Sequence, residues 1–127
     1  MAIDILIAED EPSILESLDF ILRRAGWHVS SVTDGDAALE AVRRLNPRMV
    51  VLDVMLPKRS GFDVLKHIRA GIATRAMPVL ILTAKGQLQD RRIAEELGAD
   101  AFVTKPYANA DVVGAVRQLL GENGGPA

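Results

Sequence analysis

The sequence contains no cysteine, no long apolar run and no large excess of charge of either sign, and each absence narrows its possible functions. Without cysteine there is neither a disulfide framework nor a thiolate metal site. No stretch reaches the roughly 18–20 apolar residues that a membrane span requires. The 15 basic and 17 acidic residues leave a net charge of −2, which gives no support to nonspecific binding of nucleic acid or membranes. We therefore expect a cytoplasmic chain that binds neither.

The length and composition predict a single domain. The 127 residues suffice for one hydrophobic core, and an apolar fraction of 49% with a charged fraction of 25% is ordinary for a globular protein. No internal repeat or linker is visible, and the chain closes on a polar, glycine-rich stretch. We expect one domain over residues 1–121 and a flexible tail over residues 122–127.

Short apolar segments alternate five times with segments of helical periodicity. Strands are expected at residues 5–8, 27–32, 49–53, 79–82 (continuing into 83–84) and 101–104. Helices are expected from Pro12 to Gly26, from an Asp34 cap to Leu45, from Ser60-Gly61 to about Gly71, around residues 93–97, and from an Asn109 cap to Leu120. Apolar strands separated by amphipathic helices predict a doubly wound α/β fold, in which helices cover both faces of a parallel sheet.

Polar residues stand where four of the expected strands end. Glu9 and Asp10 follow the first strand, Asp53 ends the third, Thr83 follows the fourth and Lys105 follows the fifth. Right-handed crossovers bring the carboxyl ends of parallel strands to the same edge of the sheet. The fold therefore gathers three carboxylates, a hydroxyl and an ammonium in one crevice.

These groups together suit phosphoryl transfer to an aspartate. Clustered carboxylates repel one another unless a cation lies among them, and oxygen ligands without histidine or cysteine favour Mg²⁺. The Thr83 hydroxyl and the Lys105 ammonium can each hold a phosphate oxygen. Asp53, between a metal ion and an ammonium, is placed to attack phosphorus in line, and a carboxylate nucleophile forms an acyl phosphate.

With these residues the chain resembles the receiver domain of two-component response regulators. Asp53 lies 43 residues after Asp10, Thr83 lies 30 after Asp53, and Lys105-Pro106 begins 22 after Thr83. The loop Asp53-Val-Met-Leu-Pro57, with Gly61 after it, and the segment Gly98-Ala99-Asp100 also match the family. The resemblance covers about residues 3–121. It implies a CheY-like, flavodoxin-like fold, with five helices and a five-stranded parallel sheet in the order 2-1-3-4-5.

The resemblance implies a Mg²⁺ cofactor and a phosphoacceptor. Asp53 would accept the phosphoryl group. Asp10, Asp53 and the backbone carbonyl of Met55 would ligate Mg²⁺ directly, whereas Glu9, which replaces the aspartate often found there, would act through water.

The resemblance also implies a switch and its partners. A sensor histidine kinase or a histidine phosphotransfer protein would supply the phosphoryl group, and Thr83 and Lys105 would hold its oxygens. The loop after the fourth strand would move and Phe102 would turn inward. Output would appear on the face of the fourth helix, fifth strand and fifth helix, which could also form a phosphorylation-dependent dimer. The chain would catalyse its own phosphorylation and dephosphorylation without being a turnover enzyme; the downstream target stays open.

Three other functions remain to be weighed. An aspartyl-nucleophile phosphatase resembling haloacid dehalogenases needs a second aspartate two residues after the nucleophile, where this chain has Met55. A flavin-binding electron carrier needs a hydroxyl- and glycine-rich phosphate loop after the first strand, where this chain has Glu9-Asp10-Glu11. A receiver whose output ignores phosphorylation would not need the complete set of site residues. Whether the native protein stands alone or continues into an output domain stays open.

Overall fold

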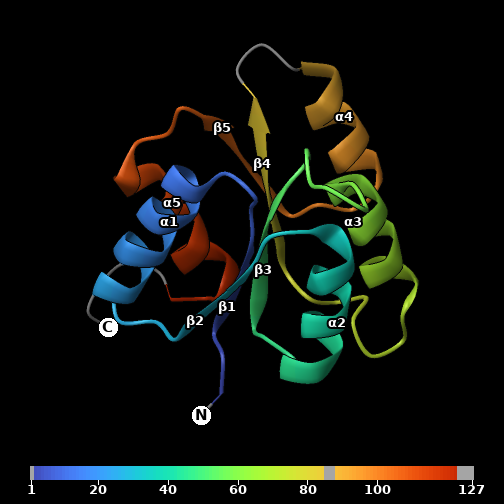
Figure 1. Cartoon of the computed structure of the whole chain (residues 1–127), viewed down its shortest axis with the longest axis horizontal. Helices are drawn as coiled ribbons and strands as arrows, with labels where there is room; N and C mark the ends of the chain where they lie inside the picture. The colour runs from blue at the N-terminus through green and yellow to red at the C-terminus, as the bar shows by residue number, and fades with distance from the viewer. Residues whose placement is uncertain (1, 85–87, 123–127) are drawn as a thin grey trace.

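A computed structural model describes residues 2–84 and 88–122, in which five strands alternate with five helices (Figure 1). The strands are β1 (Ile5–Ala8), β2 (Val29–Val32), β3 (Met49–Asp53), β4 (Val79–Ala84) and β5 (Ala101–Lys105). The helices are α1 (Pro12–Arg24), α2 (Gly35–Leu45), α3 (Gly61–Ala70), α4 (Leu88–Glu96) and α5 (Asn109–Leu119). The predicted alternation of strands and helices is confirmed.

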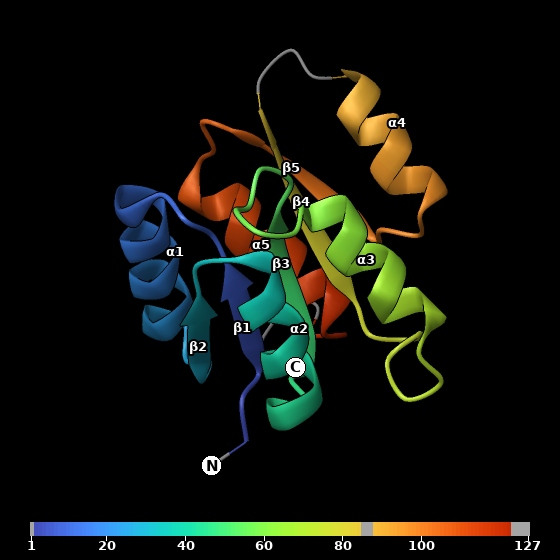
Figure 2. The ribbon, with the colours of Figure 1, turned by 45° about the vertical axis from the view of Figure 1, so that its right-hand side comes forward.

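The five strands form one parallel sheet in the order β2-β1-β3-β4-β5, which confirms the predicted fold class. Their carboxyl ends share one edge, at the top of the sheet in Figure 2. At that edge Asp53 is in register with Leu82 of β4, and Ala84 is in register with Lys105 of β5. The register therefore sets the ends of β3, β4 and β5 side by side.

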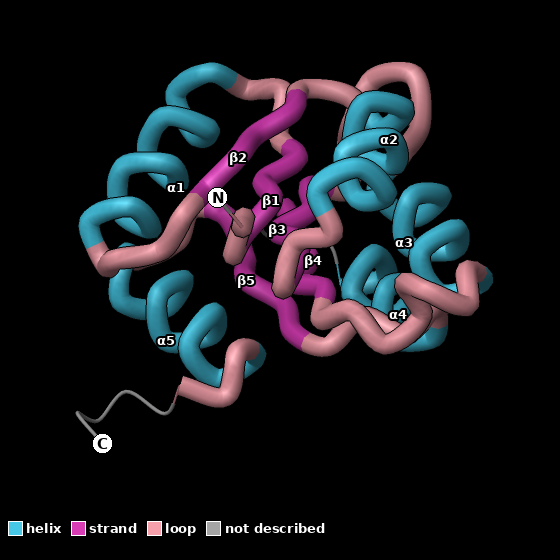
Figure 3. Tube along the Cα trace, turned by 90° about the horizontal axis from the view of Figure 1, so that it is seen from below, coloured by secondary structure: helices cyan, strands magenta, loops and turns pink. Residues whose placement is uncertain are grey.

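Helices cover both faces of the sheet. Helices α1 and α5 lie on one face and α2, α3 and α4 on the other, as the end-on view in Figure 3 shows. Alternate residues of β1 point to opposite faces of the sheet. Ile5 and Ile7 pack in the core under α1 and α5, whereas Leu6 and Ala8 pack in the core under α2 to α4. All four are fully buried, which is why this strand reads as a continuous apolar run.

One of the two predicted side-chain caps is confirmed, and Ser60, which was expected only to begin its helix, is a further cap. The Asp34 carboxylate accepts a hydrogen bond from the Ala37 N–H at 2.7 Å at the start of α2. Ser60 Oγ accepts one from the Asp63 N–H at 3.2 Å at the start of α3. The prediction that Asn109 caps the last helix is wrong, because the extended residue before α5 is Ala108 and Asn109 is already helical.

The second strand is two residues shorter than predicted. Val29, not Trp27, begins β2. The Trp27 N–H donates to the Leu22 carbonyl at 3.3 Å, so this residue closes the end of α1 instead of joining the sheet. Trp27 is 7% exposed and belongs to the core under α1 and α5.

The last described residue contacts the domain. Glu122, which the sequence places first in a flexible tail, accepts hydrogen bonds from Trp27 Nε1 and Arg48 Nη1, each at 3.1 Å. The rest of the expected tail, residues 123–127, lies outside the described residues, as do residues 85–87 of the loop expected to move after β4. None of the described helices is both long and apolar enough to cross a membrane.

Candidate functional site

The polar residues predicted to meet at the carboxyl edge of the sheet do meet there. Lys105, the last residue of β5, directs its ammonium between two carboxylates that come from the ends of other strands. Its Nζ lies 2.8 Å from Glu9 Oε1 and 3.1 Å from Asp53 Oδ2. Three segments far apart in the sequence are thus joined by one pair of charge contacts.

This charge cluster is almost completely removed from solvent. The exposed fraction of the side chain is 0% for Glu9, 7% for Asp53 and 20% for Lys105. An ionised carboxylate is costly to bury unless a cation and hydrogen bonds compensate it. Here the second Glu9 oxygen accepts a hydrogen bond from the Glu11 N–H at 3.1 Å, so the turn after β1 supports the buried acid.

The surroundings shift the pKa values of two members of the cluster. Burial raises the pKa of Glu9 above its usual range; Lys105 opposes this effect, and the negative charge of Asp53 adds to it. Burial alone would lower the pKa of Lys105, but the close contact with Glu9 and the negative charges of Asp53 and Glu9 outweigh burial, so this pKa is raised. The ammonium therefore stays charged at neutral pH while Glu9 resists ionisation.

A third carboxylate completes an acidic cluster that fits a hard cation. Glu9, Asp10 and Asp53 each offer an oxygen, and these atoms lie within 4.8 Å of one another. Asp10 is exposed, unlike the other two. Glu9 Oε1 is buried and accepts no well-aligned hydrogen bond in the described structure, although the Lys105 ammonium lies beside it. An all-oxygen donor set with an incompletely satisfied buried oxygen suits Mg²⁺.

The loop after β3 is held against the strand that carries Asp53. The Met55 N–H lies 3.4 Å from Asp53 Oδ1, and the Met55 side chain is largely exposed. The Gly61 N–H donates to the Val54 carbonyl at 2.9 Å. A Cβ at Gly61 would lie 2.2 Å from the Asp53 carbonyl oxygen, so only glycine permits this approach. Met55, the expected source of a backbone ligand, therefore lies in a tight loop beside the carboxylates.

Thr83 stands on the neighbouring strand, one residue beyond the level of Asp53. It is 2% exposed and in register with Thr104 of β5. Asp53 is in register with Leu82, so the residue that follows Leu82 lies at the same edge as the carboxylates. The structure thus places Thr83 at the predicted edge of the sheet.

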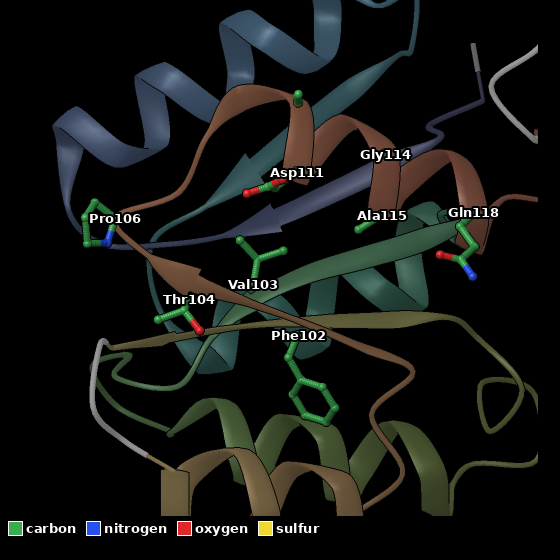
Figure 4. Close-up of a pocket in the computed structure, with 9 residues that line it drawn as sticks. Phe102, Val103, Thr104, Pro106, Asp111, Gly114, Ala115 and Gln118 are labelled. Atoms are coloured by element: carbon green, nitrogen blue, oxygen red, sulfur yellow. The ribbon is translucent and has the colours of Figure 1, made fainter.

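Phe102 lies away from this cluster, on β5. Its side chain points to the opposite side of the strand from Val103, toward α3 and α4 (Figure 4). It packs at the margin of the core under α2 to α4, and the Arg91 guanidinium carbon lies 5.0 Å from the centre of its ring. It is partly buried and also borders a hollow of about 640 Å³ between β5 and α5.

Two features of the site have no counterpart among the sequence-based expectations. The first is the direct contact between Lys105 and Glu9, at 2.8 Å. The second is Arg59, whose guanidinium bridges Asp36 at the start of α2 and Asp63 in α3. Opposite charges four residues apart, on either side of the start of the expected third helix, were a signal for the contact between Arg59 and Asp63.

Comparisons with known proteins point to one family. The family model described as the response regulator receiver domain matches residues 5–117. The probable transcriptional regulatory protein TcrX of Mycobacterium tuberculosis is 42% identical over 122 residues, which are 96% of this chain and 51% of that protein. The phosphate regulon transcriptional regulatory protein PhoB of Escherichia coli is 36% identical over 120 residues, which are 94% of this chain and 52% of that protein.

Solved structures give the same result. The receiver domain of a sensor histidine kinase from Pseudomonas aeruginosa, which has a magnesium ion coordinated in its active site cleft, matches with a TM-score of 0.87 at 27% identity. That match covers 95% of this chain and 99% of the other. The curated relatives are longer, and this chain spans about half of their length.

Proposed function

The chain belongs to the receiver domain family of two-component response regulators, and on that premise we propose that it is a switch operated by phosphorylation of Asp53. The observation that carries the proposal is the buried contact of Asp53 with Lys105, beside Glu9 and Asp10. Asp53 ends a central strand of the sheet, and its carboxylate contacts the Lys105 ammonium. A phosphoryl group bound there would meet a cation that the fold already holds in place.

In the proposed reaction, one carboxylate oxygen of Asp53 attacks phosphorus of a phosphohistidine. The new O–P bond forms as the N–P bond breaks, and the electron pair stays with the departing imidazole nitrogen. The acyl phosphate is later hydrolysed by water, which restores the carboxylate and releases inorganic phosphate. The Lys105 ammonium and the Thr83 hydroxyl would hold phosphoryl oxygens during both steps, so catalysis consists mainly of positioning and charge compensation.

Glu9, Asp10, Asp53 and the Met55 backbone carbonyl would hold the Mg²⁺ that the family implies. When bound, this ion neutralises the charge of the carboxylates and of the transferring phosphoryl group. With all groups ionised, three carboxylates and one ammonium leave the cluster with two uncompensated negative charges. That residual charge would draw a divalent cation to the edge of the sheet.

The switch would start from the resting position of Lys105. Phosphorylation replaces a carboxylate of charge −1 by a group of charge near −2 with three strong acceptor oxygens. The ammonium would move from its contacts with Glu9 and Asp53 toward this group, and Thr83 would follow. Phe102, now held on the α3 and α4 side of β5 beneath Arg91, would turn inward and change the face formed by α4, β5 and α5.

We assign the partners by the same reasoning. A sensor histidine kinase or a histidine phosphotransfer protein would supply the phosphoryl group, as the family implies. The face of α4, β5 and α5, which includes the hollow in Figure 4, would bind a downstream target or a second copy of the chain. The absence of substrate turnover and a cytoplasmic location, both expected from the sequence, stay predictions.

The test is phosphorylation by a small-molecule donor. The chain, incubated with Mg²⁺ and acetyl phosphate, should gain the mass of one phosphoryl group, in an acid-stable and base-labile bond. Asp53→Asn should abolish the gain, whereas Asp111→Asn on the exposed side of α5 should keep it. Full labelling of the Asp53→Asn variant would remove Asp53 from the proposed role, and labelling that persists without Mg²⁺ would exclude the metal requirement.

A further inference from the structure

The loop between β3 and α3 is anchored on its outer side to the start of α2. The Pro57 carbonyl accepts hydrogen bonds from two backbone groups: the Gly35 N–H at 3.1 Å and the Arg59 N–H at 2.7 Å. A Cβ at Gly35 would lie 2.0 Å from the Arg59 carbonyl oxygen. The first residue of α2 therefore packs directly against the loop backbone, and only glycine allows this distance.

One side chain closes this contact. Arg59 Nε donates to Asp36 Oδ1 at 3.0 Å, and Arg59 Nη1 donates to Asp63 Oδ2. Asp36 lies in the first turn of α2 and Asp63 in the first turn of α3. The fork of the guanidinium thus spans the loop and ties together the two helices on either side of it. A lysine has a single charged nitrogen and cannot reproduce this fork.

The same loop carries Met55 and begins directly after Asp53. Its inner side is fixed by the hydrogen bond from the Gly61 N–H to the Val54 carbonyl. With both sides fixed, few conformations remain open to the backbone between Asp53 and Gly61. A backbone carbonyl that binds a metal ion benefits from this restriction, because the loop does not have to lose conformational freedom when the ion binds.

We propose that Arg59 is a positioning residue for Mg²⁺ binding, acting through the Asp36–Arg59–Asp63 bridge that holds the loop after Asp53. The inference rests on the proposed function, because it takes Met55 as a ligand. It goes further in assigning a role to a side chain that is not itself a ligand.

The direction of the change in Mg²⁺ affinity distinguishes this proposal from a purely electrostatic effect of Arg59. Removing a positive charge near an acidic cluster strengthens its attraction for a divalent cation. If Arg59 acted only through its charge, Arg59→Gln would bind Mg²⁺ more tightly. If it acts by ordering the loop, the variant binds Mg²⁺ more weakly. Arg59→Lys, which keeps the charge and loses the fork, should then also bind it more weakly.

The chain contains a matched control at the other edge of the sheet. Arg48 precedes β3 and also bridges two carboxylates, with Nη1 3.3 Å from Asp4 Oδ1 and 3.1 Å from Glu122 Oε2. Arg48→Gln removes the same charge and a similar bridge, far from the acidic cluster. Any effect of general destabilisation or of net charge should appear in both variants.

The experiment is a Mg²⁺ titration of the full chain, followed by the backbone amide signals of the site, together with hydrogen exchange of the Gly35 amide in metal-free protein. In Arg59→Gln we expect the Kd for Mg²⁺ to rise about 3- to 10-fold, at or below the lower end of what outer-shell metal partners contribute. The Gly35 amide should exchange about tenfold faster as the loop opens. Arg48→Gln should leave both quantities within about twofold of the parent, the usual range for an exposed substitution.

Every other outcome overturns the inference. Equal Kd values in the two variants, or weakening without faster exchange at Gly35, would show that the loop bridge does not position the metal site. Faster exchange with an unchanged Kd would show that the bridge orders a loop that Mg²⁺ does not use. If the parent protein itself bound no Mg²⁺, the proposed function would fail first, a result that the parent titration reveals separately.

Discussion

Replacing Lys105 by methionine should destabilise the metal-free protein at neutral pH. The substitution keeps an unbranched side chain and removes the ammonium that contacts Glu9 at 2.8 Å and Asp53 at 3.1 Å. Removing one partner of a buried ion pair costs about 3–5 kcal/mol, because a buried charge is left without compensation. The Lys105 side chain is 20% exposed, so solvent screens part of its charge, and we expect a loss of about 2–3 kcal/mol in the free energy of unfolding.

The loss should depend on pH with a definite sign. Burial raises the pKa of Glu9, and Lys105 opposes that shift, so the pKa should rise further without the ammonium. A carboxyl group whose pKa is higher in the folded state favours folding below its unfolded pKa, and this contribution is lost as the pH rises through the folded pKa. The difference between parent and Lys105→Met should therefore be larger at neutral pH than in acid, and it should shrink as the pH falls toward 4.5, the ordinary value for Glu9.

Mg²⁺ should restore part of the free energy of unfolding that Lys105→Met loses. The ammonium and a bound metal ion would compensate the same carboxylates, so removing the ammonium should strengthen binding of the ion. At ten times its Kd, an ion bound only to the folded state contributes about 1.4 kcal/mol. Stabilisation by a fixed Mg²⁺ concentration should be larger in the variant than in the parent.

Urea unfolding followed by fluorescence of Trp27, the chain's one tryptophan, measures all three effects. Lys66→Met, on the exposed side of α3, is the matched control and should change stability by less than about 0.5 kcal/mol. A Lys105→Met variant as stable as the parent at neutral pH without Mg²⁺ would refute the reasoning. So would a deficit that persists unchanged at low pH, because Glu9 would then not be the uncompensated group.

Three further predictions concern the backbone and the far edge of the sheet, each read by the same urea unfolding. Lys58→Gly should stabilise the protein by about 0.5–1 kcal/mol, because Lys58 has a φ of 67° and glycine adopts the left-handed region without strain; a destabilised variant would contradict this. Gly35→Ala should destabilise by about 1–3 kcal/mol, since its Cβ would overlap the Arg59 carbonyl oxygen; an unchanged midpoint would show that α2 shifts freely. Asp4→Asn should cost about 1 kcal/mol at neutral pH, because the hydrogen bond from the His28 N–H favours the ionised carboxylate and lowers the pKa of Asp4. A group with a lowered folded pKa stabilises the protein above its unfolded pKa, and this stabilisation is lost as the pH falls through the folded pKa. The difference between parent and variant should therefore vanish well below pH 3.8, and a difference that persisted there would show that ionised Asp4 is not its source.

The fold could be predicted wherever one physical effect dominated. Strands β1, β3 and β4 are buried on both faces, so their apolar runs marked them with boundaries close to those observed. The edge strand β2 has the pattern Val-Ser-Ser-Val, and its start could not be told from the turn that closes α1. Asn109 is a strong capping residue by type, but α5 becomes helical one residue earlier than that prediction required, so Ala108 takes the capping position.

The site could be predicted to the level of strand ends and no further. Parallel topology alone brings the ends of β1, β3, β4 and β5 to one edge, which is why Glu9, Asp53, Thr83 and Lys105 were expected together. Which of these side chains contact one another depends on their lengths and conformations at that edge, and a sequence does not specify the conformations. The bridge made by Arg59 depends on how closely Gly35 approaches the loop, which is a property of helix packing.

Glu9 adds a condition to the proposed switch. In the resting state its carboxylate is fully buried and shares the Lys105 ammonium with Asp53. If Lys105 moves to a phosphoryl group, Glu9 loses its nearest cation and would be left as a buried, uncompensated charge. Such a charge costs several kcal/mol, comparable to the roughly 5.5 kcal/mol needed to move a two-state equilibrium from 1:99 to 99:1. The proposed movement of Lys105 would therefore require that Glu9 bind Mg²⁺ or take up a proton, and the raised pKa of Glu9 favours the second route as the pH falls. In the proposed switch, phosphorylation, metal binding and the position of Lys105 would thus be coupled through one buried carboxylate.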